Sequence, residues 1–214
     1  MQAERRVYTA VEELLHSGLH GVGAIVFFAL TAFLVSRSGG LGSAAALSAL
    51  LYGASVVATF SASFLFHSAS HGTRTRAVLE VFDHSAIYFM ILGTYLPILL
   101  IRLDDTVGYV LFALCATCAV AGAAVSVINL GALRSVGFAL YIGAAFFVIL
   151  ALLLHPHKVG SEGGMLLLGG VICYTGGIFF YRRRELKYMH VAWHALVLAG
   201  SLFHFFAILG ICYS

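Results

Sequence analysis

Residues 191–212, VAWHALVLAGSLFHFFAILGIC, form an apolar run without aspartate, glutamate, lysine or arginine. A run of this length matches the roughly 20 residues that a helix needs to cross a hydrocarbon core of about 30 Å. Similar runs precede it in the chain, at about residues 17–36, 43–66, 81–101, 107–127, 132–154 and 163–181. We therefore predict an all-α integral membrane bundle of seven transmembrane helices.

The composition supports a multi-pass membrane protein. Hydrophobic residues make up 61% of the chain and charged residues only 10%, whereas charged residues make up about 25% of soluble domains. The segments between the apolar runs are too short to hold a soluble domain, so residues 1–214 are expected to form a single domain. The first apolar run is too long for a signal peptide and lacks a small-residue cleavage site, so we expect it to be retained.

Lysine and arginine predict the orientation, because they are enriched in the cytoplasmic segments of membrane proteins. With the N-terminus inside, nine of these residues are cytoplasmic: Arg5, Arg6, Arg74, Arg76, Arg134, Arg182, Arg183, Arg184 and Lys187. Only three lie outside: Arg37, Arg102 and Lys158. Seven spans then place the C-terminus outside. Contact with anionic membrane lipids accounts for the net charge of +3, so we expect no nucleic-acid partner.

The segment before the first span has helical amphipathicity over residues 7–20. We expect residues 1–16 to be cytoplasmic and to lie at the membrane interface. Glu13, His16 and His20 share one helix face because they are spaced at i, i+3 and i+7. The expected state of this face is a solvated polar stripe at the headgroup boundary, and the sequence assigns no function to it or to Glu12.

Four ionisable residues fall at the ends of apolar runs, on the predicted cytoplasmic side: His67, Asp83, His190 and His194. An ionisable side chain at membrane depth costs about 2.5–3.5 kcal/mol on insertion scales and usually marks a site. His190 and His194 are one helical turn apart and can share a metal ion. A third imidazole from His67 would complete the three-ligand arrangement of catalytic zinc. A proton or ion pathway and interhelical hydrogen bonds are the alternatives.

Asp83 and Ser63 are the candidate catalytic residues. Asp83 either binds zinc directly or accepts a proton from a water on the zinc, as a general base does. Ser63 lies one turn before His67 and faces the same way. Its hydroxyl is suited to stabilise an oxyanion or to orient a substrate, although it can equally bond to a carbonyl of its own helix.

Three further histidines compete with this assignment. His71 is also four residues after His67, but the run at residues 71–74 resembles a loop. His84 adjoins Asp83 and points about 100° away around the helix, so we expect it to contact the ligand residues from outside or to pack against a neighbouring helix. His204 shares a helix face with His190 but lies about 21 Å further along the axis. It cannot bind the same ion, and we expect it to contact substrate in a polar pocket or to bond to a neighbouring helix.

The residues around these positions resemble a known family. Ser61–His67, Asp83–Pro97 and His190–Phe205 resemble, in the same order, the hemolysin III family, the bacterial branch of the progestin and adiponectin receptor superfamily. The resemblance implies a bacterial cytoplasmic membrane protein in which His67, His190 and His194 bind Zn²⁺ near the cytoplasmic face. It also implies that Asp83 reaches the zinc through a water and that Ser63 belongs to the site.

The first segment, from Glu12 to Gly21, is similar to the opening motif of the family. It departs from that motif, since His16 stands where asparagine is usual and Leu19 where threonine is usual. Ceramidase-like activity in the wider superfamily implies a zinc-dependent hydrolase of a lipid amide or ester, with the substrate in a cavity of the bundle. A zinc-containing receptor or regulator of membrane state is the alternative. A pore-forming hemolysin is a weaker one, because no span carries a continuous polar stripe.

Overall fold

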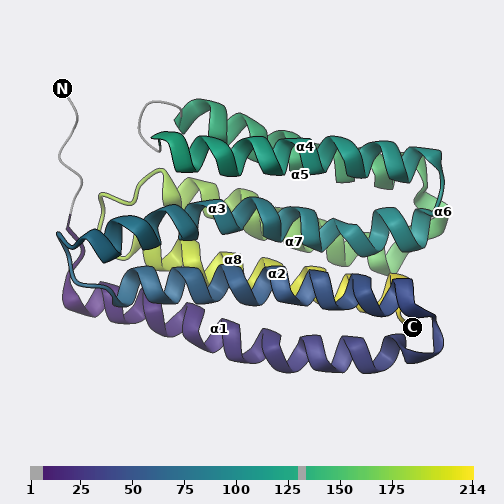
Figure 1. Ribbon diagram of the computed structural model, residues 1–214, viewed down its shortest axis with the longest axis horizontal. Helices are drawn as coiled ribbons and strands as arrows, with labels where there is room; N and C mark the ends of the chain where they lie inside the picture. Colours follow the sequence, from purple (N-terminus) through teal and green to yellow (C-terminus); the bar gives the residue numbers. More distant parts are fainter. Residues whose placement is uncertain (1–6, 130–133) are drawn as a thin grey trace.

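The computed structural model describes residues 7–129 and 134–214 (Figure 1). Arg5, Arg6, the first part of the predicted interfacial segment and the first residues of the predicted fifth run lie outside this range. All regular secondary structure in the described chain is helical, which confirms the all-α prediction. The long helices are α1 (Ala10–Arg37), α2 (Ser43–Ser68), α3 (Arg74–Pro97), α4 (Thr106–Asn129), α5 (Arg134–Leu154), α7 (Ser161–Tyr181) and α8 (Met189–Cys212). Shorter pieces are η1 (Ser38–Gly40), η2 (Ile98–Leu103) and α6 (Pro156–Val159).

Six helical segments are long and apolar enough to cross a membrane, and the apolar part of α5, residues 139–154, is shorter. The predicted apolar runs therefore correspond to six long span candidates and one shorter helix among the described residues. Large apolar side chains such as Ile25, Phe28 and Leu153 are exposed on the outer surface of the bundle. An apolar outer surface of this kind suits contact with lipid tails. The backbone N–H and C=O groups need no water there, because they are hydrogen-bonded within the helices.

The helices lie side by side along the long axis of the molecule (Figure 1). Helix α2 packs between α1 and α3, and α8 packs against both α7 and α1. The contact between α8 and α1 brings the last helix beside the first. As a result, the start of α1, the end of α2 and the start of α8 meet at one end of the bundle, which is the left-hand end in Figure 1.

A capping box fixes the start of α1. The Thr9 side chain accepts a hydrogen bond from the Glu12 N–H, and the Glu12 carboxylate accepts one from the Thr9 N–H at 3.0 Å. Such reciprocal bonds satisfy backbone donors that a helix N-terminus otherwise leaves unpaired. Glu12 also accepts from the backbone N–H of Tyr188 at 3.0 Å. This carboxylate therefore joins the start of α1 to the residue that precedes α8.

The prediction of a solvated stripe at the start of α1 is wrong. From Ala10 the helix runs without a break into the first span, and Glu12, Glu13, His16 and His20 on it are buried. The physical reason is that α2 and α8 cover this face, so the polar side chains point into the bundle. Three of these groups, Glu13, His16 and His20, lie beside the predicted histidines His67 and His194.

Candidate metal centre

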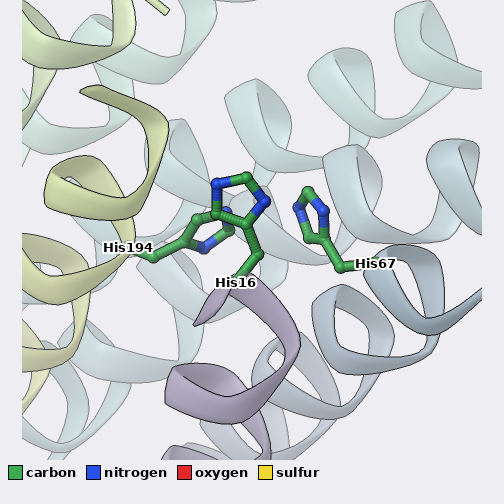
Figure 2. Close-up of side chains that lie close together, drawn as sticks. All are labelled: His16, His67 and His194. Carbon is green, nitrogen blue, oxygen red and sulfur yellow. The ribbon is translucent and has the colours of Figure 1, made fainter. Parts of the chain in front are cut away.

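Three buried imidazoles converge where α1, α2 and α8 meet (Figure 2). His16 comes from α1, His67 from the last turn of α2 and His194 from the second turn of α8. One ring nitrogen of each lies within 4.8 Å of the others, and the side chains are turned toward one another. None of the three residues is more than 3% exposed. Imidazole nitrogens gathered in this way could hold a metal ion.

Glu13 fixes the orientation of His67. Its Oε2 accepts a hydrogen bond from Nδ1 of His67 at 2.6 Å and lies 3.5 Å from Nδ1 of His16. An ionised carboxylate can only accept, so the ring proton of His67 is on Nδ1 and its Nε2 carries a lone pair. A carboxylate behind a metal-binding imidazole commonly fixes the ring and its tautomer in this way.

The nitrogens that remain fit a metal ion. Nε2 of His16, of His67 and of His194 is buried and has no hydrogen-bond partner among the described residues. Nδ1 of His194 lies 2.8 Å from Nε2 of His20, so its own Nε2 is unprotonated when His194 donates this bond. Buried polar atoms are rarely left unpaired. Three unpaired imidazole nitrogens in one place are the donor set that zinc uses.

His190 lies at the edge of this group. The centroid of its ring is 4.5 Å from that of His194, 4.9 Å from that of His16 and 5.5 Å from that of His67. The ring of Tyr8 stacks on that of His190, with the two centroids 5.2 Å apart. The structure thus brings His67, His190 and His194 together as expected from the sequence. It adds His16, which belongs to the tightest group of three, whereas His190 does not.

A second set of contacts on Glu13 ties the site to α3. Oε1 of Glu13 pairs with the guanidinium group of Arg76 and with Nε2 of His71, which is 3.0 Å away. Arg76 also donates to the backbone oxygens of Phe66 and Ala69 at the end of α2. Arg76 therefore holds the end of α2, and with it His67, against Glu13.

His71 and His84 lie outside the three-imidazole group. Helix α2 ends at Ser68, so His71 is in the following loop, as the sequence predicts. Its side chain is 44% exposed and contacts the outer oxygen of Glu13. His84 uses Nδ1 to donate to the backbone oxygen of Glu80 at 2.8 Å.

Ser63 and Asp83, the predicted catalytic residues, differ in burial, and neither belongs to the three-imidazole group. Ser63 is 1% exposed, and its hydroxyl bonds to no carbonyl of the described chain. Asp83 is half-buried on α3, with Oδ2 at 3.9 Å from Nδ1 of His84. Neither residue supplies an atom to the group of three ring nitrogens.

Replacing Glu13 with glutamine should weaken zinc binding about 10- to 100-fold, the usual effect of losing a carboxylate behind a metal ligand. The amide no longer forces the proton of His67 onto Nδ1. Titration of the purified protein with a competing zinc chelator measures the affinity. The matched control is His71→Asn, which removes a contact on the outer oxygen of Glu13 but leaves the bond to His67. Equal zinc affinity in Glu13→Gln and the wild type would contradict the role of Glu13.

Comparison with known proteins shows the family of this chain. The model of the family described as "Haemolysin-III related" matches residues 8–205. The chain is 31% identical to the hemolysin-3 homolog of Bacillus subtilis (strain 168) over 96% of this chain and 97% of that protein. It is 33% identical to hemolysin-3 of Bacillus cereus over 92% of this chain and 90% of that protein. The family model covers His16, His67 and His194, the three histidines of the candidate metal centre, and the chain belongs to the hemolysin III family.

Proposed function

We propose that this protein is a zinc-dependent membrane hydrolase that cleaves an amide or ester bond of a lipid, in a ceramidase-like reaction near the cytoplasmic face. The observation that carries the proposal is the convergence of three buried, unpaired imidazole nitrogens from α1, α2 and α8. Imidazole ligands suit zinc, and three of them leave a coordination position free for water or substrate. Zinc bound there would polarise a carbonyl group and activate water at neutral pH.

Side chains of the protein would bind the ion, orient the substrate and accept the proton. His16, His67 and His194 would hold the ion, and Glu13 would keep His67 in its binding tautomer. The buried hydroxyl of Ser63 is free to donate a hydrogen bond to a substrate oxygen. Asp83 would accept the proton of the attacking water. The apolar surface of the bundle is exposed to membrane lipids. A lipid is therefore the substrate class that the location of the protein in the membrane favours.

The experiment that tests this function uses the full chain in lipid nanodiscs and a panel of lipid amides and esters that includes a short-chain ceramide. We expect hydrolysis of at least one lipid by the zinc-loaded protein, loss of turnover after chelation and recovery after zinc is returned. A protein that keeps its zinc but hydrolyses no member of the panel would contradict the hydrolase function.

A receptor or regulator of membrane state is the second candidate, and the position of His190 favours it. With His190 as well as His16, His67 and His194, the protein has enough imidazoles to fill a tetrahedral zinc site. A zinc with four protein ligands is closed and structural, whereas a catalytic zinc keeps an exchangeable position. The coordination number of the bound ion therefore separates the two candidates. Lysis of liposomes by the purified protein would instead support a pore, the activity that the relatives' name suggests.

A further inference from the structure

A second site is suggested by a cavity of about 170 Å³ among α3, α5, α7 and α8. Its walls are mainly apolar and include the aromatic rings of Tyr95, Tyr141, Phe146 and Tyr174 together with His204. None of the histidines of the metal centre lines it. For comparison, an apolar protein cavity of about 150 Å³ holds a benzene molecule. This cavity is therefore large enough for a ring or a short stretch of alkyl chain.

His204 is the most unusual group in the cavity wall. The residue is 1% exposed, and Nε2 donates a hydrogen bond to the backbone oxygen of Leu167 at 3.2 Å. The Cδ2–Nε2 edge of the ring rests on Gly170 of α7, where any side chain larger than hydrogen would collide with it. The ring is therefore held from α7 by this one edge, and the opposite Nδ1–Cε1 edge is turned away from Gly170.

The hydrogen bond to Leu167 determines whether Nδ1 of His204 is a donor or an acceptor. A carbonyl oxygen only accepts hydrogen bonds, so the proton of neutral His204 is on Nε2 and Nδ1 is an acceptor. Nδ1 is buried and finds no donor within the described part of the chain. The neighbouring hydroxyl of Tyr174 is already used, because Ser201 donates to the backbone oxygen of Val197 and so accepts from Tyr174 at 2.9 Å. His204 thus presents an unsatisfied acceptor in apolar surroundings, which is costly unless a ligand supplies the donor.

We propose that this cavity binds a lipid-soluble alcohol, whose hydroxyl group donates to Nδ1 of His204 while its apolar body fills the space between the aromatic rings. Ile142 and Phe146 in the wall on α5 are also exposed on the outer surface of the bundle, so the rest of a longer molecule can extend into the bilayer there. A carboxylate is excluded, because it offers no donor and its charge is strongly disfavoured in an apolar site. The site lies on residues other than those of the metal centre, and it does not depend on the hydrolase activity.

The probe for this site is a long-chain primary alcohol that carries a diazirine, photocrosslinked to the full chain in phosphatidylcholine nanodiscs and located by peptide mass spectrometry. We expect labelling of α3, α5 or α7 beside the cavity, competed by the unlabelled alcohol. The methyl ether and the carboxylic acid of the same chain length should compete at least tenfold less well, since neither donates a hydrogen bond at neutral pH.

Two variants test the geometry. His204→Phe keeps a ring of similar size against Gly170 and should lower the affinity for the alcohol about tenfold, the effect of losing one buried hydrogen bond. Ala145→Phe fills the cavity from α5 without touching the bonds of His204 and should abolish labelling. Its matched control is Ala113→Phe on the exposed face of α4, which should label as the wild type does.

Thermal melting confirms that each variant is folded before labelling is compared. Equal affinity of the alcohol for the wild type and His204→Phe would overturn the proposal, as would equal competition by the ether. Labelling that survives in Ala145→Phe would place the alcohol outside this cavity and would also overturn it. Because these readouts need no zinc and no turnover, their failure is distinguishable from failure of the proposed hydrolase.

Discussion

Replacing His194 with alanine is expected to reduce the bound zinc from about one ion per chain to a small fraction of that amount. His194 supplies one of the three buried ring nitrogens that lie within 4.8 Å of one another. Without it only two helices of the group remain attached to the ion, and two imidazoles do not make the three-ligand set that zinc sites in proteins use. Metal analysis of purified protein measures the loss.

The controls are His71→Ala and His84→Ala, which should both keep the zinc because their rings lie outside the three-imidazole group. Thermal melting of the variants after zinc is removed separates loss of the ion from loss of the fold. Full zinc occupancy in His194→Ala would contradict the metal centre.

Metal analysis of single variants also decides whether His16 or His190 is the third zinc ligand. The tightest group contains His16, whereas the resemblance to the superfamily assigns a ligand role to His190. If three ligands bind the ion and His16 is one of them, His16→Ala should lose zinc as severely as His194→Ala, and His190→Ala should lose much less. A large loss in both variants would instead indicate four imidazole ligands and a closed site.

Asp83→Asn is expected to abolish turnover while leaving zinc largely bound. The amide has the shape of the carboxylate but cannot take up a proton, so it cannot act as the base. Asp83 also lies outside the group of three ring nitrogens, and the imidazole ligands therefore stay in place. Lipid hydrolysis and zinc content are measured on the same preparation, across a series of pH values.

The matched control is Asp105→Asn, which changes a carboxylate to an amide in the segment between η2 and α4, outside the spanning helices. It should keep both zinc and turnover. Equal hydrolysis by the wild type and Asp83→Asn would remove Asp83 from the mechanism. Loss of zinc in Asp83→Asn would mean that the carboxylate binds the ion directly.

Most of the fold can be predicted from the sequence, because each helix that crosses a bilayer must have its own run of apolar residues. The positions of His67 and His194 were readable for a related reason, since an ionisable group at membrane depth needs a partner or a cavity. The run predicted at residues 132–154 corresponds to α5, Arg134–Leu154, which has 21 residues, as α7 has.

His16 was missed for a physical reason that is visible in the structure. Glu13, His16 and His20 share a helix face, and that spacing alone is compatible either with contact to water or with burial. Burial is decided by the packing of α8 against α1, a contact between segments far apart in the chain. The only local sign was the cluster of ionisable groups on one helix face close to the first apolar run, where water has limited access.

Zinc binding by the histidines of α1, α2 and α8 is measured by X-ray absorption at the zinc edge on purified wild-type protein. We expect about one zinc per chain, with nitrogen and oxygen neighbours about 2.0–2.1 Å from the ion. At least three of these neighbours should show the outer-shell scattering of imidazole rings. A protein that takes up no zinc, or a zinc shell dominated by sulfur at about 2.3 Å, would contradict zinc binding by these histidines.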